Sequence, residues 1–206
     1  MGLIKKLYDW VLGLAQKPNG DISLGILSFS EASFFPIPPD VLLIPLCLGN
    51  RKKIYFFAFI CSCFSIIGAI FGYYIGKLLW WNMPGTEYSY IANMFFEYVP
   101  GITIEGFNRI QAMYDRYNFW IVFTAGFTPI PFKLITISAG TFNINFLMFV
   151  VASIISRSAR FFIVASLIKV FGDPIKEFIE KYFNLLAIAF TILLAGGFII
   201  IKYIIV

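Results

Sequence analysis

Two short proline motifs, each with an ionisable residue just past its second proline, are the residues of this chain best placed for chemistry. They read Pro36-Ile37-Pro38-Pro39-Asp40 and Pro129-Ile130-Pro131-Phe132-Lys133, and both interrupt stretches that are otherwise almost continuously apolar. Proline removes a backbone donor and clashes with the preceding helical turn, so each motif should break a helix. Such a pair of interrupted apolar segments, one in each half of a chain, is typical of a transport site in the middle of a membrane.

Three further ionisable residues are expected at the same depth. Glu31 precedes the first motif, and Arg157 and Arg160 lie in a later apolar segment at a spacing that places both on one helix face. Charges in hydrocarbon cost about 3 kcal/mol each on the insertion scale, so these groups cannot simply face lipid. We expect the acids Glu31 and Asp40 to meet the cations of the second half, which are Lys133 and the two arginines. Such a cluster could hold an anionic head group while a carboxylate exchanges a proton, and the alternative is an ion-pair network that only fixes the structure.

The composition indicates an integral membrane protein of one domain. Of the 206 residues, 60% are hydrophobic, 19% aromatic and 13% charged, and the mean hydropathy is +0.84, far from the values of soluble proteins. The net charge of +5 is spread over loops and helix ends, which favours an anionic membrane surface over nucleic acid as the partner.

Neither a cofactor nor an enzymatic site is expected. The chain has no histidine, and Cys47, Cys61 and Cys63 lack the spacing of metal ligands. No nucleophile, base and orienting group occur at a recognisable spacing, and water is scarce at membrane depth. The sequence therefore predicts binding and movement of a ligand more readily than its chemical conversion.

The apolar segments predict an all-α membrane fold built as an inverted repeat. Each half should hold a re-entrant helical hairpin broken at its proline motif, because each limb is too short for a hydrocarbon core of about 30 Å, and then a transmembrane helix. Amphipathic helices at the membrane surface precede both hairpins. The predicted ranges are an amphipathic helix over 1–18, a hairpin over 22–49, a transmembrane helix over 54–81, an amphipathic helix over 105–117, a hairpin over 119–142, and transmembrane helices over 145–171 and 184–206.

Charge and glycine patterns add an orientation and a packing surface. Basic residues are more numerous on the side of the N-terminal helix and of Arg51-Lys52-Lys53, so that side should be cytoplasmic. Gly68, Gly72 and Gly76 recur every fourth residue and form a smooth seam for close helix packing. The seam could pack within the chain or between copies of it, so a homo-oligomer stays open.

The same residues resemble a known family. The run from Glu31 to Asp40, the glycine seam, and the run from Phe127 to Lys133 followed by Ala139-Gly140 resemble the DedA or VTT-domain superfamily, also called SNARE-associated Golgi protein-like, and within it the YqaA-like branch. The resemblance covers roughly residues 20–172. It implies a multi-pass protein of the bacterial inner membrane with two re-entrant hairpins, in which Glu31 and Asp40 are the membrane-embedded acids.

The resemblance also implies a function, lipid transport. Members are associated with moving phospholipids or polyprenyl-phosphate lipids between leaflets, in some cases coupled to protons. Many place two arginines around the second proline motif, whereas this motif carries only Lys133, a point charge and not a bidentate fork; whether Arg157 and Arg160 substitute is open. The alternatives to a lipid translocase or scramblase are a proton-coupled secondary transporter of a small solute or ion, and a membrane assembly factor without transport activity.

Overall fold

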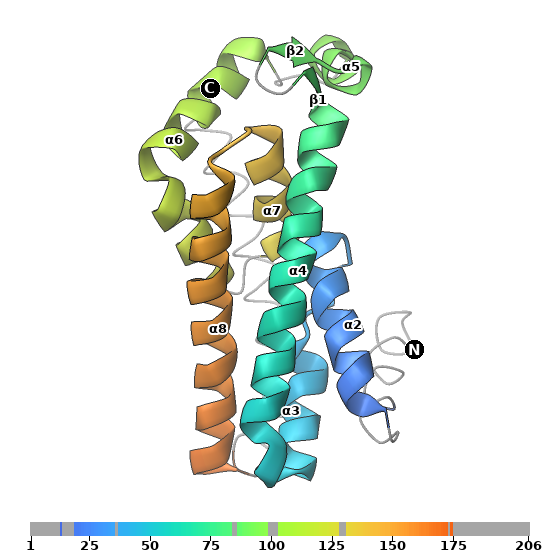
Figure 1. The fold of residues 1–206 in the computed structure, drawn as a ribbon, viewed down its shortest axis with the longest axis vertical. Coiled ribbons are helices and arrows are strands. Elements are labelled where there is room, and N and C mark those ends of the chain that lie inside the picture. Colours follow the sequence, from blue (N-terminus) through green and yellow to red (C-terminus); the bar gives the residue numbers. More distant parts are fainter. Residues whose placement is uncertain are drawn as a thin grey trace.

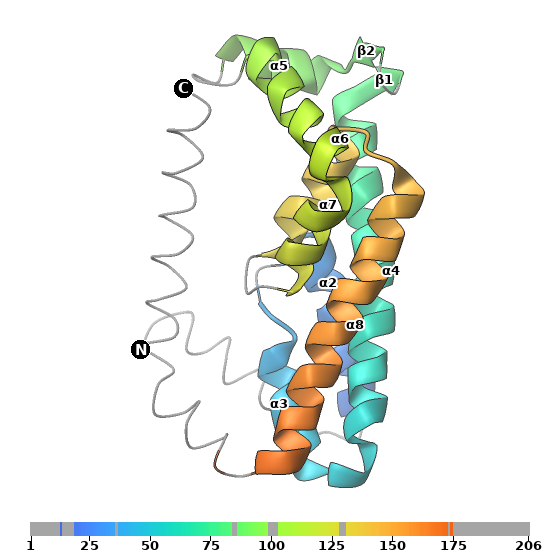
Figure 2. The ribbon, with the colours of Figure 1, turned by 90° about the vertical axis from the view of Figure 1, so that its left-hand side faces the viewer.

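Two long antiparallel helices form the centre of the molecule. The computed structural model describes residues 13, 19–35, 37–83, 86–98, 103–127, 131–172 and 174. Helix α4 (Ile54–Trp80) runs along most of the length of the described structure, and α8 (Phe146–Phe171) runs beside it in the opposite direction (Figures 1 and 2). Most of the helix predicted over 1–18, all of that predicted over 184–206, and Pro36 and Pro129 lie outside the described residues.

Two helical hairpins pack on this pair from opposite ends. Helices α2 (Gly20–Ser33) and α3 (Asp40–Gly49) form the first, near the start of α4, and α6 (Ile104–Phe127) and α7 (Phe132–Thr141) form the second, near its end (Figure 1). Helix α2 packs on α4, while α6 packs on α8 and α7 on α4. The described parts of both hairpins end partway along the long helices (Figure 1), and the inverted repeat stays a prediction. The re-entrant placement of these hairpins in a membrane stays a prediction.

The second hairpin differs from the sequence prediction in its first limb. The sequence predicts an amphipathic helix over 105–117 and a separate limb from 119, but α6 is unbroken from Ile104 to Phe127. Between Gly106 and Gly126 the chain has neither proline nor glycine, so nothing ends the helix where its polarity changes. The polar segment and the apolar limb are two ends of one helix.

Short elements connect the long ones. A 3-10 turn (Arg51–Lys53) joins α3 to α4. Beyond α4, two short antiparallel strands, β1 (Trp81–Met83) and β2 (Glu87–Tyr88), lead into α5 (Tyr90–Tyr98). The all-α prediction holds for the described residues apart from this strand pair.

The two long helices are suited to lipid on their outer faces. Among the described residues, Arg51–Trp80 and Phe146–Phe171 are long and apolar enough to cross a membrane. Their outer faces expose large apolar side chains, among them Phe59, Ile67, Phe71 and Leu78 on α4 and Leu147, Ile155, Ile163 and Val170 on α8. An apolar surface of this extent is unusual on a soluble monomer, which supports a membrane protein.

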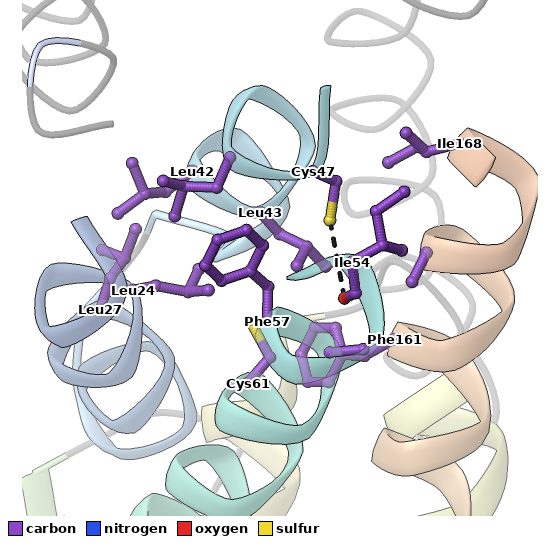
Figure 3. Packing of buried hydrophobic residues seen from close by; sticks show 13 residues of the cluster. Leu24, Leu27, Leu42, Leu43, Cys47, Ile54, Phe57, Cys61, Phe161 and Ile168 are labelled. Atoms are coloured by element: carbon purple, nitrogen blue, oxygen red, sulfur yellow. Dashed lines mark hydrogen bonds between the residues drawn. The ribbon is translucent and has the colours of Figure 1, made fainter. Parts of the chain in front are cut away.

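Two apolar clusters hold the hairpins in place. The first joins α2, α3, α4 and α8 through Leu24, Leu43, Phe57 and Phe161 (Figure 3). The second surrounds Tyr73 of α4 and contains side chains from α7 and α8. Two of its buried polar groups donate to backbone carbonyls: the Tyr73 hydroxyl to Ile144 O at 2.7 Å and Trp81 Nε1 to Thr141 O at 2.7 Å.

The glycine seam of α4 is used inside the chain. A Cβ atom at Gly68 would meet the backbone of Phe29 on α2, and one at Gly76 would meet the backbone of Ile137 on α7. At Gly72, between them, it would meet groups of both hairpins, Thr136 Oγ1 and Ala32 O. The missing side chains thus let both hairpins approach one face of α4 at backbone distance.

Replacing Gly76 with alanine should therefore destabilise the fold. The added methyl group overlaps the Ile137 carbonyl, which is backbone and cannot rotate away, so we expect a loss on the order of 1–3 kcal/mol and a lower midpoint of thermal unfolding in detergent. Gly49→Ala is the matched control, because a Cβ atom there meets nothing within 4 Å. Equal midpoints for the two variants would contradict the close packing of α4 and α7.

Candidate functional site

Two ion pairs connect the first hairpin to α8. Arg157 Nη2 donates to Glu31 Oε2 at 2.5 Å, and Arg160 Nη2 donates to Asp40 Oδ2 at 2.6 Å. Four of the five ionisable residues singled out from the sequence thus meet as two acid–arginine pairs. The cations of both pairs come from α8 and not from the second proline motif.

The break in the first hairpin delivers both acids to the same helix. Glu31 lies in the last turn of α2, and Asp40 is the first residue of α3. Asp40 at a helix N-terminus is also favoured by the helix dipole. Because Arg157 and Arg160 share a face of α8 at a spacing of three residues, one bend can place an acid opposite each of these arginines.

Arg157 is enclosed on every side. Its residue is 1% exposed, and its guanidinium carbon lies 4.8 Å from the ring centroids of both Phe132 and Phe161, a distance that permits cation–π attraction. Arg157 Nε donates to Ser65 Oγ at 2.7 Å. Together with Glu31, these contacts connect α8 to α2, α4 and α7 through one side chain.

The Asp40–Arg160 pair is more open. Both of its side chains are 18% exposed, in contrast to the fully enclosed Arg157. The difference is chemical as well as geometric, because a partly exposed ion pair can exchange partners with water or a ligand. An enclosed pair must first be exposed, and an uncompensated buried charge is costly.

Lys133 does not join the acids as the sequence predicts. Its Nζ donates to Phe34 O at 3.3 Å, and among the described residues no carboxylate lies within ion-pair distance of it. Lys133 misses the acids because the first turn of α7 faces the backbone at the end of α2. Thr136 Oγ1, three residues further along α7, also donates to this backbone, to Ala32 O at 2.8 Å. Cations are favoured at the carbonyl end of a helix, so Lys133 is positioned at the bend of the first hairpin.

Several residues of the site were not identified from the sequence. Phe132 and Phe161 enclose the guanidinium of Arg157, and Ser65 binds it from α4. Phe132 lies inside the second proline motif, which was a usable signal, whereas a single serine or phenylalanine in an apolar helix carries none.

Two buried polar atoms beside these groups have no hydrogen-bond partner among the described residues, Arg157 Nη1 and Ser153 Oγ. They lie one helical turn apart on α8, so they share a face. The centre of the molecule thus has a free donor in Arg157 and a free hydroxyl in Ser153. Within the part of the chain that the structure describes, no group of three or more metal-binding side chains accompanies them.

Comparison with known proteins identifies relatives but no solved structure. The sequence pattern of the VTT-domain family matches residues 37–170. This range contains Asp40, Lys133 and both arginines, and it begins after Glu31. An uncharacterized protein of Haemophilus influenzae is 30% identical over 204 residues, which are 98% of this chain and all of that protein. An uncharacterized protein of Histophilus somni is 32% identical over 184 residues, 87% of this chain and 91% of that one. No solved structure matches the chain significantly.

Removing one partner of the enclosed pair should cost more than removing both. Arg157→Gln leaves Glu31 buried without its cation, and Glu31→Gln leaves the arginine without its anion, so each should lose about 3–5 kcal/mol of stability. The double variant retains no charge to compensate and should recover part of that loss, measured as the midpoint of thermal unfolding in detergent.

The control is the exposed pair Glu105–Arg109, in which Glu105 Oε1 and Arg109 Nη2 are 3.9 Å apart. Glu105→Gln should leave the midpoint unchanged, because exposed ion pairs contribute little. If the losses of the two single variants simply added in the double variant, the pair would not be coupled as described.

Proposed function

Because the chain belongs to the VTT-domain (DedA) family, we propose that it is a membrane lipid translocase or scramblase, which moves phospholipid or polyprenyl-phosphate lipids between leaflets. The observation that carries the proposal is the Asp40–Arg160 pair, partly open and located at the bend of a broken helix, with Lys133 bound to the same bend. Broken helices that bring charged groups to the middle of a membrane are typical of transport sites.

The two ion pairs have different roles in this proposal. Glu31–Arg157 fixes the first hairpin against both long helices and stays closed. Asp40–Arg160 and Lys133 contact the substrate, because a lipid phosphate is the kind of anion that arginine and lysine bind. Buried ion pairs stabilise a fold less well than apolar packing does, so a purely structural role would leave the cost of these charges unexplained.

The phosphate and the Asp40 carboxylate compete for Arg160. When a proton neutralises Asp40, the ion pair with Arg160 is lost and the phosphate binds in place of the carboxylate; when the proton leaves, the ion pair forms again and the phosphate is released. Proton exchange at a single carboxylate thereby couples the state of the site to pH. The inverted hairpins on a common glycine seam provide equivalent approaches to the site from the two leaflets.

A shallow apolar surface on α8 supports a lipid over a small solute as the substrate. A shallow depression of about 390 Å³ lies along one side of this helix, lined by Ala159, Phe162, Ile163, Ser166, Leu167 and Val170. All six lining residues belong to α8, and the lining is almost entirely apolar, as an acyl chain requires. A solute transporter would need the same charges in a chamber sealed from the bilayer.

The orientation follows from the basic end of the molecule. Arg51, Lys52 and Lys53 lie in the exposed turn between α3 and α4. We therefore propose that this end faces the cytoplasm, that the N-terminus is cytoplasmic too, and that the protein lies in the inner membrane of a bacterial cell. The glycine seam is occupied within the chain, and the proposed mechanism needs one copy.

Asp40→Asn and Lys133→Gln should each abolish lipid movement while the yield of folded protein stays near normal. The first removes the group that exchanges the proton, and the second removes a cation at the bend. The assay is purified protein in liposomes with headgroup-labelled phospholipid, read at two pH values with an external quencher, and the expected rate for both variants is that of protein-free liposomes.

Glu105→Gln is the matched control, since Glu105 is an exposed acid of α6 away from the site, and it should transport as the unchanged protein does. Full transport by either site variant removes that residue from the mechanism. A rate that does not depend on pH removes the proton step, and uptake of a solute without lipid movement favours the secondary transporter.

A further inference from the structure

Helix α5 lies beyond the far end of α4, beside the strand pair (Figure 1). Ser89, the residue before α5, attaches the helix to α4: its backbone N–H donates to Trp80 O at 2.9 Å and its hydroxyl donates to Leu79 O at 2.5 Å. The same hydroxyl accepts from Ala92 N at 3.2 Å and so caps the helix. A nine-residue helix would be marginal in isolation, so these bonds define its position.

The helix has three distinct faces. Ala92 is buried and Phe96 half-buried on the inner face, where the Phe96 ring lies 5.6 Å from Trp80 and 5.1 Å from Tyr88. Asn93 and Glu97, one turn apart, form an exposed polar edge.

The third face is apolar and uncovered. Tyr90, Met94 and Tyr98 follow at intervals of four residues and are 80%, 44% and 69% exposed, and Ile91 and Phe95 flank them. A short helix that packs on protein with one face and leaves a second apolar face open, beside a polar edge, has the pattern of an interfacial helix.

We propose that α5 binds lipid at the membrane–water boundary of this end of the molecule, with the face of Tyr90, Met94 and Tyr98 on the lipid and the Asn93–Glu97 edge in water. The place where α5 joins α4 indicates lipid. Leu78 and Leu79, in the last turn of α4, are 73% and 48% exposed and belong to the outer apolar face of that helix. Ser89 bonds to the carbonyls of Leu79 and Trp80, and the Phe95 ring lies 5.8 Å from that of Trp80, so α5 begins at this apolar turn. Tyrosine, which α5 exposes at two positions, is favoured at headgroup depth.

The consequence is a fixed depth for the far end of the molecule. Through Ser89 and the aromatic contacts of Trp80, a helix seated in the boundary sets how far α4 enters the membrane, and hence the level of the hairpin bends that α4 carries. The inference rests on the membrane assignment and is independent of transport.

The test uses full-length protein in lipid nanodiscs with a spin label at residue 94 or residue 93. Cys63→Ala is the background, because Cys47 and Cys61 are fully buried, and this background without an added cysteine should take no label. Met94→Cys should then be more accessible to oxygen than to a water-soluble nickel complex, and Asn93→Cys, on the polar edge, should show the reverse.

Two results overturn the proposal. If residue 94 is as accessible to nickel as residue 93, the face lies in water. If residue 94 is shielded from both reagents, protein covers it and the occupant is a partner or a second copy.

Discussion

A charged side chain in an apolar interior must find an opposite charge, and Arg157 is where this fold meets that constraint. Its guanidinium binds Glu31 and Ser65 and lies between the rings of Phe132 and Phe161. These contacts come from both hairpins and both long helices. Loss of this one group would leave the acid uncompensated and remove contacts to both hairpins at once, so the site and the fold depend on the same interaction.

The enclosed Glu31–Arg157 pair holds the bend at which the Asp40–Arg160 pair lies. Asp40–Arg160 lies one helical turn further along α8 and stays partly exposed, while the enclosed pair next to it maintains the position of the bend. A site that must release its ligand needs groups that can change partners, held by groups that do not. The close packing of both hairpins on the glycines of α4 gives these bends a rigid support.

The sequence predicted the parts of the molecule that depend on local chemistry. Proline places the breaks, apolar length places α4 and α8, and the cost of charge in hydrocarbon brings Glu31 and Asp40 to the arginines. It failed where the outcome depends on packing in three dimensions. The unbroken α6 contains no residue that marks the change from surface to interior, and Lys133 binds a carbonyl because of how α7 meets α2, which no local pattern records.

The most direct test of the account is the depth of the two hairpin bends. Phe34 and Leu134 are exposed residues beside them and can each be replaced by a cysteine carrying a fluorophore in liposomes that contain lipids with a quencher at one of several depths. The account predicts that the quencher at the end of the acyl chain is the most effective for both positions. If headgroup quenchers were the most effective, with Phe34 near one membrane surface and Leu134 near the other, a shared site in the middle of the membrane would be contradicted.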